Sequence, residues 1–324
     1  MYFVKFTLLL FIVGTSTANA QVDNIAPTYR NISSNKYFRI HYDNDFFTNS
    51  DYYYTQGISL ELAHPSVSKF FLTKLLIKPN SHEMKYGVAL NHFGYTPTSI
   101  SSNEILDGDR PFAGTLYLKT FATATDNIKH RRITSALNTG IIGPAAGSKQ
   151  MQTGIHRWLK NIMPKGWQHQ VRNDIILNYQ LNYEQQLLSF KKVLLLNAAA
   201  EVQAGTLKDK LSTGVNFMIG KFNSPYGKSV NSKATKKHVD LYIYGAPQIS
   251  LVAYDATLQG GVFNRRSPYT IAATDISRIT FQASAGIVLN IKKLNLEYCQ
   301  SYLTKEFRTG NFHRWAGIKM GFLF

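Results

Sequence analysis

Apolar and polar residues alternate along most of the chain after residue 36, in segments that are separated by short polar turns. Alternation with a period of two is typical of β-strands that have one polar and one apolar face, and few stretches show helical periodicity. The pattern predicts about a dozen strands, at 37–46, 53–63, 83–95, 111–124, 131–143, 171–187, 190–206, 211–221, 238–253, 278–290, 294–307 and 312–324.

Many of these segments are long for a globular protein and carry Tyr, Phe or Trp near their ends. A tilted strand that crosses a membrane needs roughly 9–11 residues and places aromatic residues at both interfaces. The last segment ends on Phe324 and resembles the terminal strand of bacterial outer-membrane barrels. We therefore expect an all-β fold, a transmembrane antiparallel β-barrel of about 12 strands, with a soluble β-sandwich as the alternative.

If both ends of such a barrel lie in the periplasm, the connections after odd-numbered strands face outward, which places 42–57, 96–110 and 143–170 outside. The segments 64–82 and 222–237 are then unusually long for periplasmic turns. In the insert 143–170, Met151, Ile155, Trp158, Leu159 and Ile162 recur at helical spacing on one face. This periodicity predicts a helix between Ser148 and Met163 that lies over the barrel rim, with His156 beside the apolar stripe.

The first residues have the pattern of a secretory signal: Lys5, an apolar run at 6–13, and the small residues Ala18-Asn19-Ala20. We expect a signal peptide at 1–20 and a single barrel domain at 21–324. Cys299 is the only cysteine, so an intrachain disulfide is excluded. The net charge of +17 indicates an anionic partner. Because the basic residues are spread over many loops, this charge favours an anionic membrane surface over nucleic acid.

Two groups of residues are candidates for chemistry. Asn44, Asp45 and Thr55 bring carboxylate, amide and hydroxyl oxygens to the first outer hairpin, and such oxygens are ligands that Ca²⁺ accepts. Asp and Asn are also common turn residues, so an ordinary polar turn is the alternative. His156, on the predicted helix of the same outer face, is a candidate general base, although a single His is more often a surface or packing residue.

A series of short motifs, in order along almost the whole chain after the predicted signal peptide, resembles the outer-membrane lipid A 3-O-deacylases of the LpxR type. The motifs are Asn44-Asp45, Tyr54-Thr55-x-Gly57, Tyr95-Thr96-Pro97, Gly108-Asp109-Arg110, Gly140-Ile141-Ile142-Gly143-Pro144-x-Ala146-Gly147, Gln150 followed six residues later by His156-Arg157, Trp167-Gln168-x-Gln170, Thr257-Leu258-Gln259-Gly260 and Glu306-Phe307-Arg308-Thr309-Gly310.

The resemblance implies a Ca²⁺-dependent ester hydrolase that removes the 3-O-linked acyloxyacyl chain of lipid A in the outer leaflet of the bacterial outer membrane. It implies a site between the outer wall and a loop helix, with Asn44 and Asp45 at the metal. His156 would activate water, assisted by Asn44 and Thr55, and the metal would stabilise the oxyanion. We expect lipid A, or the lipopolysaccharide that contains it, as the partner, no nucleic acid, and a monomeric protein.

One loop departs from the family pattern, because a Lys-Arg pair expected in the second outer loop is replaced by Ser, Thr, Ile and Asn at 98–103. Lys149, Arg157 and Lys160 on the insert are therefore candidate ligands for a lipid A phosphate, together with Arg110. Basic residues on an exposed helix are more often only a solvated face, which is the alternative. For Arg110, an ion pair with the preceding Asp109 is the competing role.

Two other functions stay open. An outer-membrane phospholipase uses a Ser nucleophile beside His and Asn, and the sequence shows no Ser-centred group around His156. A non-catalytic porin or adhesin is the other alternative, although about a dozen strands leave a narrow lumen that side chains can fill.

Overall fold

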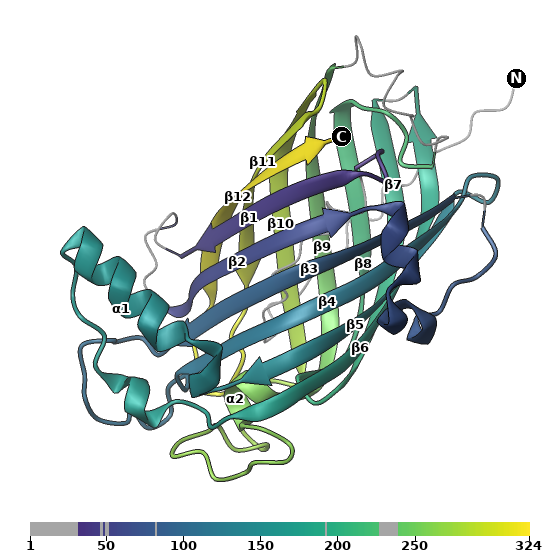
Figure 1. Ribbon diagram of the computed structural model, residues 1–324. Coiled ribbons are helices and arrows are strands. Elements are labelled where there is room, and N and C mark those ends of the chain that lie inside the picture. Colours follow the sequence, from purple (N-terminus) through teal and green to yellow (C-terminus); the bar gives the residue numbers. More distant parts are fainter. Residues whose placement is uncertain (1–31, 46–47, 49–51, 82, 192, 227–238) are drawn as a thin grey trace, which may run out of the picture.

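The computed structural model describes residues 32–45, 48, 52–81, 83–191, 193–226 and 239–324. In this part of the chain, twelve antiparallel strands form a closed barrel, in which each strand pairs with its sequence neighbours and β1 pairs with β12 (Figure 1). The strands are β1 (Tyr37–Asn44), β2 (Tyr53–Ala63), β3 (Glu83–Thr96), β4 (Ala113–Asp126), β5 (Arg131–Ile142), β6 (Asp174–Phe190), β7 (Leu194–Gly205), β8 (Lys208–Lys221), β9 (Val239–Asp255), β10 (Ile279–Ile291), β11 (Leu294–Leu303) and β12 (His313–Leu323).

The predicted barrel is confirmed, and every predicted strand boundary lies within four residues of the observed one. The predicted signal peptide, residues 1–20, lies outside the described residues. None of the helices in the described ranges has the length and apolar character needed to cross a bilayer.

The first residue of β1, Tyr37, pairs with Leu323 near the end of β12, so both chain ends of the sheet lie at one end of the barrel. Connections after odd-numbered strands gather at the opposite end, which we call the outer end. Helices α1 (Ser148–Leu159) and α2 (Ala256–Gln259) lie there, with the 3-10 helices η5 (Pro144–Ala146) and η6 (Gly166–His169) (Figure 1). The helix predicted between residues 148 and 163 is confirmed as α1, but it ends four residues earlier, at Leu159, where Lys160 takes a left-handed conformation.

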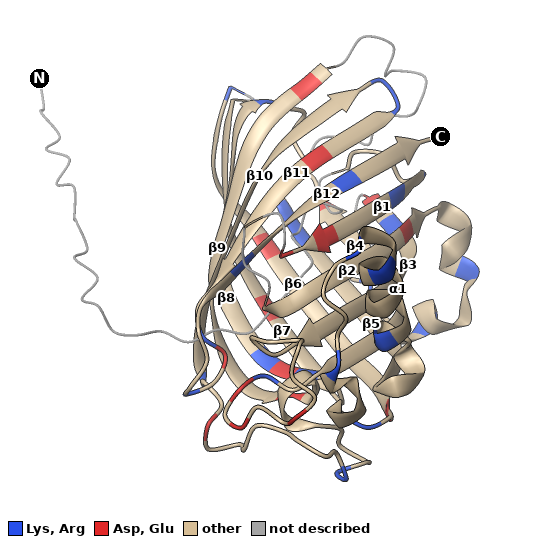
Figure 2. Ribbon diagram, turned by 90° about the vertical axis from the view of Figure 1, so that its left-hand side faces the viewer, with Lys and Arg blue, Asp and Glu red and all other residues tan. Residues whose placement is uncertain are grey.

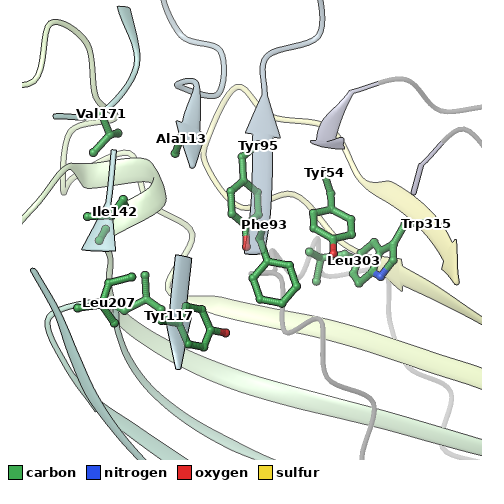
Figure 3. Close-up of a cluster of buried hydrophobic side chains, with 12 residues drawn as sticks. Tyr54, Phe93, Tyr95, Ala113, Tyr117, Ile142, Val171, Leu207, Leu303 and Trp315 are labelled. Atoms are coloured by element: carbon green, nitrogen blue, oxygen red, sulfur yellow. The ribbon is translucent and has the colours of Figure 1, made fainter. Parts of the chain in front are cut away.

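Side chains fill the lumen in the described part of the barrel. Aromatic and aliphatic residues from several strands meet near the outer end, where Tyr54, Phe93 and Trp315 lie close together (Figure 3). Acidic and basic positions lie near one another on the strands of the barrel (Figure 2). Arg132 Nη2 lies 2.8 Å from Glu184 Oε2, for example, and both side chains are 1% exposed. Buried charges are stable only when paired in this way, so the lumen is a packed polar core.

A buried arginine organises the loops that close the outer end. The Arg110 guanidinium pairs with the Glu306 carboxylate, donates from Nη2 to Thr257 Oγ1 at 2.7 Å, and lies 4.5 Å from the centre of the Tyr95 ring. The side chains of Arg110 and Glu306 are 0% exposed. We call this group and the apolar cluster beside it the plug; the cluster comprises Tyr53, Val252, Leu258, Ile271, Ile276 and Phe307.

The sequence had suggested an ion pair between Arg110 and Asp109, but the observed ion-pair partner of Arg110 is Glu306. The Asp109 carboxylate instead accepts the backbone N–H groups of Arg110 at 2.7 Å and Thr98 at 2.9 Å. The Asp109 carbonyl accepts the hydroxyl of Tyr269 at 2.9 Å, and burial raises the pKa of that Tyr269 hydroxyl. Sequence neighbours are a poor guide here, because the plug joins loops that are far apart in the chain.

The long segment 64–82 packs against the outside of the barrel, near the end opposite to the outer end. It forms the 3-10 helices η3 (Pro65–Lys69) and η4 (Phe71–Leu75), and Leu76 then packs against Ala122 of β4 and Leu137 of β5. Ser135 Oγ donates to the Ile77 carbonyl at 2.7 Å. This packing explains why the segment is longer than a periplasmic turn. In the other long segment, Phe222 and Tyr226 join a buried cluster, and 227–238 lie outside the described residues.

Candidate functional site on the outer wall

A row of outward-facing polar and small residues crosses four strands near the outer end. Side chains alternate across a sheet, so Asn44 faces outward like the exposed Ile40, and Gly94 faces outward like the exposed Leu90. Asn44 pairs with Gln56, Gln56 with Gly94, and Gly94 with Gly114. We call Asn44, Gln56, Gly94 and Gly114 the outer row.

A β-bulge adds Thr55 to the outer row. The register between β2 and β3 shifts between Tyr54 and Gln56, which leaves Thr55 as an extra residue in β2. Its hydroxyl oxygen lies 2.7 Å from that of Thr96, an outward-facing residue of β3. Bulges re-aim side chains in this way, and they often occur next to functional sites. The bulge was not visible in the sequence, because alternation alone would send Thr55 into the lumen.

Helix α1 packs against β3 and β4 at one end of this row, and its first turn sits in a slot made by two glycines. A Cβ atom on Gly114 would lie 2.4 Å from Ser148 Oγ, and one on Gly94 would lie 3.8 Å from Ser148 Cβ. Ser148 Oγ donates to the Phe93 carbonyl at 3.2 Å. The absence of side chains at both glycines therefore lets the helix approach the sheet backbone.

The buried face of α1 is polar and consists of Ser148, Gln152 and His156, spaced four residues apart. Gln152 Oε1 accepts the indole N–H of Trp167 at 2.6 Å, which holds the middle of the helix in place. Helix α1 runs across the outer ends of the strands from the β4 side toward β1 (Figure 1). His156, near the end of the helix, therefore lies on the β1 side of the glycine slot.

The end of α1 fixes the orientation of the His156 ring. Lys160 adopts a left-handed conformation with φ of 55° and turns the chain back, so that the Asn161 N–H reaches the His156 carbonyl at 2.8 Å. His156 Nδ1 lies 2.6 Å from the Ile162 carbonyl oxygen. A carbonyl only accepts, so Nδ1 carries the proton and Nε2 of the neutral ring carries the lone pair. That is the tautomer a general base needs at Nε2.

The predicted metal ligands lie at the outer end of β1. Asp45 is 1% exposed, and Asn44 Nδ2 donates to the Tyr42 hydroxyl at 3.2 Å. Asn44, Asp45 and Thr55 offer oxygen atoms and no sulfur or imidazole, which is the type of ligand that a hard cation such as Ca²⁺ takes.

A different group of potential metal ligands lies in the lumen. Ligand atoms of His41, Asp43 and Cys299 lie within 4.8 Å of one another. In β1, His41 and Asp43 have the opposite parity to Asn44, so this group is separated from the outer row by the barrel wall.

The expected substrate ligands separate into two places. Lys149 and Arg157 are exposed on α1, above the outer row. Arg110 is enclosed in the plug and does not lie with them.

A contact that the sequence did not suggest joins Ser148 to His92, with Ser148 Oγ 3.1 Å from His92 Nε2. The same nitrogen lies 3.1 Å from the Ala146 carbonyl. Because that carbonyl only accepts, Nε2 of a neutral His92 must carry the proton and has no lone pair with which to deprotonate Ser148. The contact therefore fastens α1 to β3 and does not form a nucleophile and its base.

Comparison with known proteins agrees with this architecture. A family model described as outer membrane protein LpxR matches residues 6–324. The chain belongs to the LpxR family. The structure of LpxR from Salmonella typhimurium aligns with a TM-score of 0.72 at 19% sequence identity, over 89% of this chain and 100% of that one. The beta domain of the Bordetella autotransporter Brka aligns with a TM-score of 0.45 at 10% identity, over 89% and 97% of the two chains. No curated protein sequence matches this chain significantly.

Membership of the LpxR family places the chain in the bacterial outer membrane, as its barrel fold and its sequence both predicted. The motifs that suggested the LpxR resemblance meet in two regions of the structure. One set supplies the outer row and α1, including Asn44, Thr55 and His156. The other set, which includes Arg110, Thr257 and Glu306, builds the plug. In the described residues, this chain therefore combines a filled outer end of the lumen with a row of polar residues on the outside of the barrel.

Proposed function

We propose that this protein is a lipid A 3-O-deacylase, a carboxylic ester hydrolase that removes the 3-O-linked acyloxyacyl chain in the outer leaflet and acts as a monomer. The observation that carries the proposal is the His156 ring, which lies on the buried face of α1 with its tautomer set by the Ile162 carbonyl. A base with a lone pair, held over a row of polar groups at the membrane boundary, suits the hydrolysis of a lipid ester.

The proposed reaction uses His156 first as a base and then as an acid. Nε2 takes a proton from a water molecule while the water oxygen attacks the ester carbonyl carbon. The bond from Nδ1–H to the Ile162 carbonyl stabilises the imidazolium that forms. When the tetrahedral intermediate collapses, Nε2 returns the proton to the sugar oxygen, which leaves as a hydroxyl group. The products are the free acyloxyacyl acid and the 3-hydroxyl of lipid A.

Polar groups of the outer row orient the reactants in this proposal. Asn44 and Thr55 hold the water and the ester, and Asn44 with Asp45 would hold a Ca²⁺ ion. A bound Ca²⁺ supplies positive charge for the oxyanion that develops on the ester carbonyl. The exposed Lys149 and Arg157 attract the anionic head group of the lipid.

The position of the outer row suits a substrate that arrives from the side. Tyr42 and Ile58 are the next outward-facing residues below Asn44 and Gln56, and both are partly exposed. Lipid A can therefore keep its acyl chains in the bilayer while one ester reaches the row. The plug supports lateral entry as well, since it fills the lumen at the outer end in the described part of the chain.

The two alternatives have less support. A phospholipase with a Ser nucleophile would need a base at Ser148, and the hydrogen bonds of His92 do not provide one. A porin would need an open lumen, whereas buried ion pairs and the plug occupy it in the described residues.

The test is lipid A mass spectrometry on a bacterial host that makes fully acylated lipid A and expresses this chain. We expect a lipid A species that lacks one acyloxyacyl group, together with unchanged phospholipids. Appearance of lysophospholipids with intact lipid A would indicate the phospholipase instead. Intact lipids combined with single-channel conductance in a planar bilayer would indicate the porin.

A further inference from the structure

Large apolar side chains are exposed in the last turn of α1 and directly after it. Trp158 is 81% exposed, Leu159 58%, Ile162 62% and Met163 38%. Trp158 lies opposite His156 on the helix, and Ile162 and Met163 follow the turn at Lys160, so the barrel leaves this end of the segment uncovered. We call these four residues the apolar tip.

The apolar tip lies at the height where the outer wall changes from apolar to polar. The first turn of α1 sits on Gly114, and the next outward-facing residue of β4 is the partly exposed Leu116. From there α1 extends sideways past the outer ends of β2 and β3 (Figure 1). It lies in front of the wall when that side is viewed directly (Figure 2). The tip is therefore beside the barrel, where the outer leaflet of the membrane meets it.

The charge of this segment is complementary to an anionic lipid surface. Residues 143–170 contain Lys149, Arg157, Lys160 and Lys165 and no Asp or Glu. Large apolar residues next to basic ones are typical of segments that lie in a membrane interface. A second copy of this chain is less suited to cover the apolar tip, because each copy carries a net charge of +17 and the two copies would repel each other.

We propose that the apolar tip is an interfacial anchor, which inserts Trp158, Leu159 and Ile162 among the acyl chains of the outer leaflet. Arg157 and Lys160 stay at the level of the anionic head groups, since long basic side chains reach the interface from an apolar position. The anchor holds α1 against the membrane surface and gives His156 a constant height relative to the lipid esters. The proposal rests on the outer-membrane location and does not depend on the proposed deacylation.

Trp158 is a natural probe for this anchor. The other two tryptophans, Trp167 and Trp315, are 1% and 2% exposed, so the difference in emission between the wild type and Trp158→Phe reports Trp158. The full chain is reconstituted into vesicles of lipopolysaccharide and phospholipid. Emission is then quenched either by phospholipids brominated on their acyl chains or by iodide in the water.

Two probes in the Trp158→Phe background calibrate the quenching. Leu60→Trp reports the lipid-facing wall of β2, where Leu60 is 41% exposed, and Phe263→Trp reports an outer loop, where Phe263 is 72% exposed. We expect Trp158 to lose emission to brominated chains as Leu60→Trp does, and to be far less sensitive to iodide than Phe263→Trp. The double substitution Leu159→Ser and Ile162→Ser should shift Trp158 toward iodide while heat-modifiable gel mobility shows an intact barrel.

Three results would overturn the anchor. The first is a Trp158 that lies in water, whose emission iodide would quench as strongly as that of Phe263→Trp and brominated lipid would not quench. A tip covered by another copy would be protected from both quenchers, and the protection would disappear when the protein is diluted in lipid. Unchanged quenching in the Ser double variant would show that hydrocarbon does not hold the tip.

Discussion

The lumen and the outer wall of β1–β4 both bury polar side chains, but they differ in how those groups are satisfied. In the lumen, the Glu184 carboxylate accepts Arg132 Nε at 2.9 Å, and it also accepts Asn216 Nδ2 at 2.7 Å. On the outer wall, the Ile162 carbonyl fixes one nitrogen of His156 and leaves a lone pair on the other. The comparison teaches that charges neutralised by a partner stabilise the barrel, whereas a polar group with an unused lone pair is suited to chemistry.

The largest expected effect is on the outer wall. His156→Ala should lower deacylation by about 10²–10⁴-fold, the usual contribution of a general base, and leave folding unchanged. Lipid A mass spectrometry measures the rate, and heat-modifiable gel mobility reports the fold. His64→Asn is the matched control, because His64 lies beside η3 at the far end and Asn preserves its capping ability. Near-normal activity of a folded His156→Ala protein would exclude His156 from the mechanism.

Removal of the predicted cation should have the next largest effect. Asp45→Asn and EDTA should each lower activity by about 10²–10³-fold, as expected for the loss of one group that stabilises an oxyanion. Because both changes affect the same site, EDTA should have little further effect on Asp45→Asn. Activity assays with EDTA, followed by added Ca²⁺ or Mg²⁺, test this. Full activity of the wild type in EDTA would leave Asp45 as an ordinary turn residue.

A substitution in the lumen should lower stability and leave activity unchanged, which is the opposite of the effect expected for His156→Ala. Glu184→Ala leaves Arg132 buried without its carboxylate and should lower the free energy of unfolding by about 3–5 kcal/mol. The activity per folded molecule should stay near the wild-type value, because Glu184 lies inside the wall. Urea titration in micelles measures the stability, and Glu184→Gln should lose less because its amide oxygen can still accept a hydrogen bond. Loss of activity without loss of stability would contradict the division between lumen and outer wall.

The smallest expected effect concerns how closely α1 approaches the sheet. Gly114→Ala places a methyl group against Ser148 and should displace the first turn of α1. A displacement of about 1 Å costs up to about 10²-fold in rate, so we expect a loss of roughly tenfold with little change in stability. Ser148→Gly removes the clash but also the Ser148 hydrogen bonds, so Ser148→Gly alone is the control. In the Ser148→Gly background, adding Gly114→Ala should have little further effect on activity. An equal tenfold loss in both backgrounds would mean that the contact with Ser148 is not how Gly114→Ala acts.

The strands were predictable because lipid outside and packed side chains inside impose alternation on every segment. The place of Asn44 and Asp45 at the end of β1 followed from that register. The packing of α1 did not follow from the sequence. Periodicity grouped Trp158, Leu159 and Ile162, but the helix ends at Leu159, and the residues that it buries are the polar Ser148, Gln152 and His156.

The plug and the bulge were equally hidden from the sequence. Arg110 and Glu306 are separated by almost 200 positions in the chain, and local spacing gives no information about such a pair. Thr55 reaches the outer face only because β2 contains one residue more than its partner at that point. Both features depend on tertiary register, which a single sequence does not reveal.

The segment 64–82 changes which part of the protein the lipids contact. On β9, exposed apolar residues extend from Val239 to Leu251, about 40 Å of strand. On β4, Leu116 and Leu118 are partly exposed, whereas Ala122 lies under Leu76. The segment that covers β4 is itself apolar, because Phe71, Leu75 and Ile77 are 65%, 62% and 51% exposed. Lipids beside β4 should therefore contact this segment instead of the strand, and cryo-electron microscopy in nanodiscs would show their density further from the barrel axis than beside β9. The first layer of lipid would then be uneven around the barrel, directly on the strands at β9 and held away from them below the outer row.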